Sequence, residues 1–174
     1  VTTGRSYPLG ATVSETGCNF AVYSPDARAV LLCLYHNDTE EPLSEVLLPG
    51  KSGDIWHGFV SDVKHGQLYG YRVDRGDGQL HSAPADKLLI DPCAKKLSRP
   101  MHWNARQYAN DSHFMVSKSV VVDATRYAAP SETRPTIAPH KRVIYETHVK
   151  GLTKLHPEVP ESEQGKYLGA CHPQ

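Results

Sequence analysis

Glu146 and His148 are the residues whose types and spacing come closest to an acid and base pair. Because they are two positions apart on a predicted strand, their side chains project to the same side. A carboxylate and an imidazole placed in this way can give and take protons. Two polar residues near a strand end that bond to neighbouring elements give the same pattern, and we favour this interpretation. A small complete enzyme built on the pair is the least supported alternative.

The other patterns argue against metal, phosphate and nucleic-acid chemistry. The ten histidines form no His-Glu-x-x-His or other ligand spacing, so we predict no metal and no cofactor. Gly76 to Gly78 is typical of a turn, and no glycine-rich loop leads into a helix that could hold phosphate. Nineteen basic residues balance nineteen acidic ones without a charged stripe, which disfavours nucleic acid and anionic membranes as partners. No apolar run reaches the roughly 18 residues of a membrane span.

Aromatic side chains offer a route to binding a neutral sugar. A glucose ring has apolar C–H patches that stack on Trp or Tyr, while Lys, Asn or Asp side chains satisfy its hydroxyl groups. The candidates for this chemistry are Trp56, Tyr69, Tyr71 and Trp103, with Lys87 as a polar partner. Tyr69 and Tyr71 share one face of a predicted strand, and such a face is more often core than binding platform. The alternation around Trp56 leaves its face undecided.

The first hundred residues alternate between strand patterns and turn signals. Cys18 to Tyr23 has the alternation of a half-buried strand, and Ala29 to Tyr35 is a continuous apolar run that suits a fully buried one. Further strands are predicted over Ser44 to Leu48, Ile55 to Val60 and Tyr69 to Val73, with glycines between them. Short strands at this spacing, with hardly a window of helical period, predict an all-β, immunoglobulin-like antiparallel β-sandwich over residues 1–100.

Residues 101–142 are predicted to form an irregular connector. Val120 to Asp123 is a candidate for one more strand within it. Ala128 to Pro139 contains three prolines, which fix φ and remove backbone donors, so this stretch is predicted to be an extended linker. Strand character returns over Val143 to Val149, at the start of the third predicted region, residues 143–174.

The order of several motifs resembles that of a known enzyme family. They are Tyr7 to Ala11 (YPLGA), Asn19 to Pro25 (NFAVYSP), Tyr69 to Val73 (YGYRV), Val143 to Thr153 (VIYETHVKGLT) and Leu155 to Pro160 (LHPEVP). Together they resemble the N-terminal part of bacterial glycogen debranching enzymes, which are isoamylase-type α-1,6-glucosidases of the α-amylase superfamily. The resemblance implies a starch- or glycogen-type carbohydrate-binding module, followed by a linker and a truncated first strand of a (β/α)8 barrel. It also implies α-glucan (glycogen, limit dextrin or maltooligosaccharide) and the missing catalytic barrel as partners.

The resemblance assigns no catalytic residue to this chain. Glycoside hydrolysis needs two carboxyl groups on either side of the scissile bond. In the family resembled, they lie on later barrel strands, within patterns such as Gly-Phe-Arg-x-Asp, and that pattern does not occur here. We therefore predict that the chain alone is inactive. The family's Gly-Pro-Trp and His-Arg-Phe-Asn-Pro segments are replaced by Asp74 to Pro84, whereas Lys87 to Pro92 keeps the family pattern.

Two functions from different classes stay open after these observations. The first is glucan binding or orientation by the sandwich of a debranching glycoside hydrolase. The second is a non-enzymatic, immunoglobulin-like module that docks onto another protein through its sheet edges. In either case, an apolar strand at 143–149 without neighbours is expected to self-associate or to fold back against the sandwich.

The cysteines and the N-terminus indicate a compartment. No cysteine spacing matches a Cys-x-x-Cys site, and Cys18 and Cys33 lie in apolar strand patterns, so we expect them to be buried and expect no disulfide framework. The N-terminus lacks a charged segment followed by an apolar one, which favours the cytoplasm.

Overall fold

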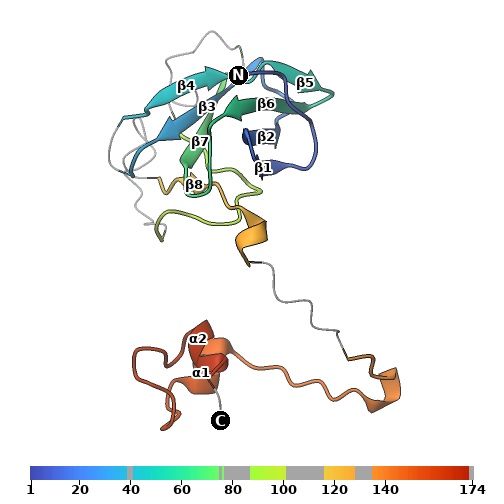
Figure 1. Cartoon of the computed structure of the whole chain (residues 1–174), viewed down its shortest axis with the longest axis vertical. Helices are drawn as coiled ribbons and strands as arrows, with labels where there is room; N and C mark the ends of the chain where they lie inside the picture. Colours follow the sequence, from blue (N-terminus) through green and yellow to red (C-terminus); the bar gives the residue numbers. More distant parts are fainter. Residues whose placement is uncertain (39–40, 75, 77–86, 101–115, 128–134, 173–174) are drawn as a thin grey trace. The chain divides into compact units, whose positions relative to one another are not determined.

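A computed structural model describes residues 1–38, 41–74, 76, 87–100, 116–127 and 135–172. The chain divides into two units, Val1–Ala128 and Ala129–Gln174, each of which is described by itself (Figure 1). The first unit contains the predicted sandwich region, residues 1–100, together with residues that follow it. Within the described ranges, no helix has the length and apolar character needed to cross a membrane.

Two antiparallel sheets form the first unit. One sheet has the strand order β1-β2-β6-β5 and the other β4-β3-β7-β8, and all the paired strands are antiparallel. The strands are β1 Gly10–Ser14, β2 Gly17–Tyr23, β3 Ala29–Tyr35, β4 Ser44–Leu47, β5 Gly50–Ser52, β6 Ile55–Ser61, β7 Leu68–Asp74 and β8 Ser119–Val120. The predicted all-β antiparallel sandwich is confirmed.

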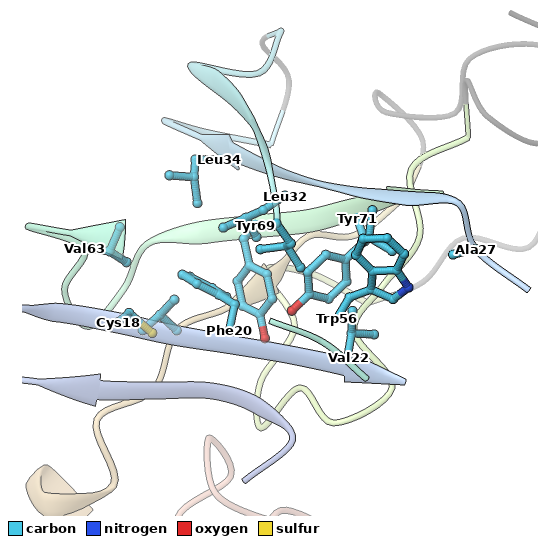
Figure 2. Packing of buried hydrophobic residues seen from close by; sticks show 13 residues of the cluster. Cys18, Phe20, Val22, Ala27, Leu32, Leu34, Trp56, Val63, Tyr69 and Tyr71 are labelled. Atoms are coloured by element: carbon cyan, nitrogen blue, oxygen red, sulfur yellow. The ribbon is translucent and has the colours of Figure 1, made fainter. Parts of the chain in front are cut away.

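The core lies between the two sheets and is built from alternate strand positions. Cys18, Phe20 and Val22 of β2 point inward, as their alternation predicts. Figure 2 shows aromatic rings at the centre of this core. The ring of Tyr69 meets Phe20 edge to face at 5.0 Å between centroids and Tyr71 at 5.8 Å. Such pairs contribute roughly 0.5–1.5 kcal/mol beyond area burial.

The N-terminal strap, residues 2–5, lies along the outer side of β2 and β6. The backbone of Arg5 exchanges two hydrogen bonds with the Asn19 amide, at 2.7 and 2.8 Å. The carbonyl of Thr3 accepts a hydrogen bond from His57 Nδ1 at 2.7 Å. Because a carbonyl can only accept, Nδ1 carries the proton. These contacts explain why Asn19 and His57 are buried although they point away from the core.

The covering segment, residues 87–98, lies over part of the outer face of the other sheet. Leu88 packs against Cys33 and Tyr35 in a second, smaller apolar cluster. Leu89 and Tyr71 exchange two backbone hydrogen bonds, at 2.8 and 2.9 Å. Gly70 makes room for this approach, since a Cβ there would lie 2.6 Å from Leu88 Cδ1. This part of the sheet is therefore not an open binding surface.

The second unit contains two short α-helices, α1 Val149–Thr153 and α2 Tyr167–Ala170, and the 3-10 turn Pro139–Lys141. His148 caps α1, because its Nδ1 accepts a hydrogen bond from the Lys150 backbone N–H at 3.2 Å. Thr153 is buried and accepts from the backbone of Gly165 at 3.0 Å, which ties α1 to the loop before α2.

The predicted strand Val143 to Val149 is wrong. Residues 143–148 have no regular secondary structure, and Val149 begins helix α1 instead. A strand needs a neighbour to bond its backbone N–H and C=O groups. Within the described part of the second unit no strand is present to supply them. The apolar pattern of this segment is real, but its side chains are exposed.

Candidate functional site

Three of the predicted sugar-binding aromatics are part of the core. Trp56, Tyr69 and Tyr71 keep only 8%, 0% and 1% of their surface exposed. They lie on the strand faces that meet the opposite sheet, so their rings stack on protein and not on a ligand (Figure 2). Their burial in the core cluster favours the interpretation as core residues over that of a binding platform.

The polar edge of Trp56 is also occupied. Its indole N–H donates to the carbonyl of Ser24 at 3.3 Å. Lys51 extends over the ring, with Nζ 4.7 Å from the centroid, and donates to the carbonyl of Ala27 at 3.4 Å. These contacts close the end of the core between the first sheet and the turn after β2.

Asp91 organises the two buried tyrosines. Its Oδ2 accepts hydrogen bonds from the hydroxyls of Tyr69 at 2.7 Å and Tyr71 at 3.4 Å. Its Oδ1 accepts from the Cys93 backbone N–H at 2.7 Å, and its own N–H donates to Ser119 Oγ at 3.0 Å. Burial raises the pKa of this carboxyl and of both phenols. The Asp-Pro pair that the sequence retains is thus structural.

The remaining predicted contacts give no sugar platform among the described residues. Lys87 is half-buried at the start of the covering segment. Trp103 lies outside the described residues. Glu146 and His148 do not form an acid and base pair, since no hydrogen bond joins them and His148 caps helix α1. Within the described ranges, no group of His, Cys, Asp or Glu side chains gathers in a way that could hold a metal ion.

A groove of about 390 Å³ at the end of the β4-β3-β7-β8 sheet is the candidate site. It lies where β3 ends and β7 begins. Its lining residues are His36, Asn37, Asp38, Gly66, Leu68, Lys96, Ser98 and Val120. They come from four separate stretches of the chain, so no single sequence motif identifies the groove.

Hydrogen bonds fix the turn after β3 to the covering segment and so hold the groove wall. Ser98 Oγ donates to Asp38 Oδ1 at 2.7 Å and accepts from the Lys118 backbone N–H at 2.9 Å. The Lys118 ammonium donates to the carbonyls of Asp38 at 3.3 Å and Val116 at 3.0 Å. It also lies 4.8 Å from the centroid of the Tyr35 ring. Lys118 is fully buried, so these contacts replace its hydration.

The groove combines the two kinds of surface that a sugar presents. Leu68 and Val120 supply an apolar wall that suits C–H patches. Asn37, Asp38 and Lys96 supply amide, carboxylate and ammonium groups that can bond hydroxyls. The polar residues of the stretch that follows β3 are typical of turns whether or not they bind a ligand, so the sequence alone does not identify them as a site.

Comparisons with known proteins relate this chain to a carbohydrate-binding family. Residues 8–94, half of the chain, match the family of carbohydrate-binding module 48 (isoamylase N-terminal domain). The chain is 39% identical to a glycogen debranching enzyme of Yersinia enterocolitica, over 99% of this chain and 27% of that enzyme. It therefore spans about a quarter of the length of that curated relative.

Solved structures of pullulanases share the fold. The apo enzyme of Paenibacillus barengoltzii matches with a TM-score of 0.69 at 22% identity, over 98% of this chain and 23% of that chain. The pullulanase of Anoxybacillus sp. LM18-11, complexed with maltotetraose, matches with a TM-score of 0.67 at 25% identity, over 94% of this chain and 21% of that chain. By its match over residues 8–94 and by its sandwich, the chain belongs to the family of carbohydrate-binding module 48, the isoamylase N-terminal domain.

Proposed function

We propose that this chain binds or orients α-glucan, such as glycogen, limit dextrin or maltooligosaccharide, in the groove at the end of the β4-β3-β7-β8 sheet. The observation that carries the proposal is the groove itself, which is lined by apolar side chains together with amide, carboxylate and ammonium groups, in a member of a carbohydrate-binding family. The maltotetraose complex of a pullulanase relative supports the choice of ligand.

The proposed activity is binding and not hydrolysis. Glycogen debranching is the activity in the name of the Yersinia relative, of which this chain covers 27%. We propose that the family's catalytic carboxylates are contributed by sequence beyond that represented here, because the Gly-Phe-Arg-x-Asp pattern is absent. The sandwich would then present glucan to a barrel.

The matched pair Lys95 and Lys96 tests the groove. Lys96 lines the groove and Lys95, next to it and exposed, does not. We expect the wild-type chain to bind maltoheptaose with a Kd of about 1 mM, because few sugar rings are covered. Lys96→Ala should weaken this binding about two- to tenfold, as expected for one lost hydrogen bond to a charged donor. Lys95→Ala should leave it unchanged in an NMR titration, and equal effects of the two substitutions would contradict the assignment.

A protein-docking module is the alternative from a different class. The two four-stranded antiparallel sheets support our description of the sandwich as immunoglobulin-like, a form that also serves protein recognition. Retention of the chain by glycogen in affinity electrophoresis supports the glucan function. A stable protein complex without any glucan retention would favour docking instead.

We also propose a strand-pairing role for the apolar segment, defined as Val143, Ile144 and Tyr145. These side chains are 95%, 88% and 79% exposed. No backbone hydrogen bond is present from Val143 to Thr147 in the described part of the chain. Such a segment gains most by pairing with another strand. A barrel sheet is the partner that the family resemblance implies, and a second copy of the chain is available when that sheet is not.

A further inference from the structure

His65 and Tyr127 form an aromatic pair at the surface of the first unit. Their ring centroids are 6.0 Å apart, with the ring planes tilted by 51°. Tyr127 is 66% exposed, and it lies in the 3-10 turn Ala124–Tyr127 that follows β8. His65 lies in the turn before β7. One side of the tyrosine ring is thus supported by protein, while much of the side chain is open to a ligand.

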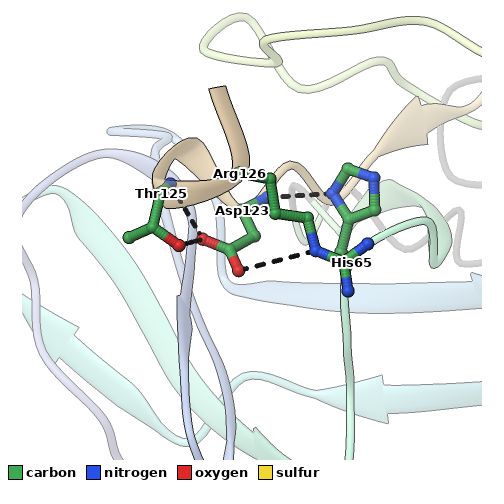
Figure 3. Close-up of polar contacts among 4 residues, drawn as sticks. All are labelled: His65, Asp123, Thr125 and Arg126. Carbon is green, nitrogen blue, oxygen red and sulfur yellow. Dashed lines mark hydrogen bonds and ion pairs between the residues drawn. The ribbon is translucent and has the colours of Figure 1, made fainter. Parts of the chain in front are cut away.

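Hydrogen bonds join His65 to Asp123 and Asp123 to Thr125, in the turn that carries Tyr127 (Figure 3). His65 Nδ1 accepts from the Asp123 backbone N–H at 3.1 Å. The neutral imidazole therefore carries its proton on Nε2, which can donate to a ligand. Asp123 Oδ1 accepts from the backbone N–H of Thr125 at 3.0 Å and from its hydroxyl at 2.7 Å. The turn that carries Tyr127 is thereby fixed relative to His65.

Two charged residues, Asp123 and Arg126, lie close to Tyr127 in the chain. Arg126 approaches Asp123 Oδ2 only at 3.9 Å and its side chain is 64% exposed, so its guanidinium retains donors for a ligand. The Thr125 hydrogen bonds lower the pKa of the Asp123 carboxyl, which keeps it ionised and able to accept hydrogen bonds. An aromatic face bordered by hydroxyl-bonding groups is the chemistry that a pyranose ring requires.

The pair adjoins the groove through the backbone. Gly66 lines the groove and directly follows His65. The Gly66 N–H donates to the carbonyl of Val121 at 2.9 Å, and Val120, the preceding residue, also lines the groove. Consecutive residues are separated by about 3.8 Å between Cα atoms, which is less than the length of one sugar ring. The backbone of His65 is therefore directly next to a residue that lines the groove.

We propose that Tyr127 and His65 form a stacking subsite for a glucose residue that lies beyond those held in the groove, so that the first unit binds an α-glucan chain better than a single short sugar. This inference rests on the proposed glucan function. Three of its residues, Asp123, Arg126 and Tyr127, lie outside the stretch that matches the family, residues 8–94. The subsite thus depends on a part of the chain that the family match does not cover.

Two ligands and three variants test the subsite in the full chain. Tyr127→Ala should weaken maltoheptaose binding about three- to tenfold, the value of one stacked ring, and should leave maltose binding unchanged. Tyr127→Phe keeps the ring and should bind both sugars like the wild type. Tyr23→Ala removes another exposed tyrosine, in β2 of the other sheet, and should have no effect. NMR titration reports both affinity and the ring signals of His65, which should shift with maltoheptaose.

The outcomes separate this inference from the proposed function. If the wild-type chain binds neither sugar, both are overturned. If Lys96→Ala weakens binding of both sugars while Tyr127→Ala changes neither, the groove stands and the stacking subsite is wrong. An equal loss for maltose and maltoheptaose in Tyr127→Ala would also overturn a separate subsite, because the disaccharide would then itself occupy the pair.

Discussion

Burial decides the chemistry of the four cysteines. All four thiols are free, and Cys18 and Cys33 are buried in strands of the two sheets, which confirms the expectation for both residues. Burial raises the pKa of each of these two thiols to about 12. Because the thiolate is the nucleophile, they should be inert at neutral pH, whereas Cys93 and Cys171 are exposed.

Alkylation tests this difference between the thiols. Iodoacetamide at pH 8 should add two groups to the folded chain, at Cys93 and Cys171, and four after unfolding in urea. Mass spectrometry of the intact chain and of its peptides gives both counts. A third adduct formed under native conditions, with the fold intact by circular dichroism, would contradict the proposed burial.

Asp91 should give stability a specific pH dependence. Burial raises its pKa in the fold above the ordinary 3.8, although three hydrogen bonds act in the opposite direction. Between 3.8 and the raised value, the folded chain keeps a proton that the unfolded chain has lost. The contribution of Asp91 to the free energy of unfolding therefore falls as the pH rises through this window.

The variant Asp91→Asn isolates this contribution. It removes the titration while keeping a side-chain carbonyl for the Cys93 N–H. The free energy of unfolding of the variant, minus that of the wild type, should increase as the pH is raised from about 3.8 and then level off. Urea unfolding at a series of pH values measures it. A difference that does not change with pH would show that the carboxyl is not perturbed in the fold.

At the scale of elements, β5 depends on close contact with the His57 ring of β6. A Cβ on Gly50 would overlap that ring. The ring cannot move away easily, because its Nδ1 is hydrogen-bonded to the Thr3 carbonyl and its Nε2 to the Ser52 hydroxyl. Gly50→Ala should therefore lower the free energy of unfolding by about 2–4 kcal/mol, from overpacking together with a lost buried hydrogen bond. Gly53→Ala, in the turn between β5 and β6, has open space and only a positive φ of 58°, so it should cost about 1 kcal/mol. Similar losses for both, in urea unfolding, would contradict the steric argument.

Strands that carry a row of apolar side chains could be predicted, and the short edge strand β5 could not. The apolar run at Ala29–Tyr35 coincides with β3, and the alternation from Cys18 coincides with β2. β5, Gly50–Ser52, contains no apolar side chain, and it is held to β6 by backbone pairing and by contacts of its polar Lys51 and Ser52 side chains. Its pairing depends on residues that are distant in the sequence, and a local pattern does not report this.

The candidate site was less predictable than the strands, for a related reason. Period-two alternation shows that Tyr69 and Tyr71 share a face, but whether that face meets a ligand or the other sheet depends on packing. The groove is assembled from the turn after β3, the start of β7, the covering segment and β8. Residues that are this far apart in the sequence show no regular spacing that would identify a common site. The family resemblance implied the ligand, α-glucan, but none of these residues.

At the scale of the whole molecule, the two units differ in how completely they bury their apolar side chains. In the first, both sheets share an apolar core, and the strap and the covering segment protect their outer faces in part. In the second, few apolar side chains are buried, Val159 among them, while the apolar segment lies open. Solubility and oligomeric state should therefore depend mainly on the second unit.

The apolar segment should make the isolated chain self-associate. Its three exposed side chains and unpaired backbone groups have a lower free energy in a strand paired with a second copy than in water. We expect sedimentation velocity to show concentration-dependent dimers or larger species, and hydrogen exchange to show protection over residues 143–149.

Ile144→Asp should shift the distribution to monomer, because strand pairing would then desolvate an aspartate on each chain and bring two like charges together. Ile137→Asp, a matched change at an exposed site outside the segment, should leave association as in the wild type. A chain that stays monomeric at all concentrations, with random-coil exchange at 143–149, would show that the segment is a solvated tail.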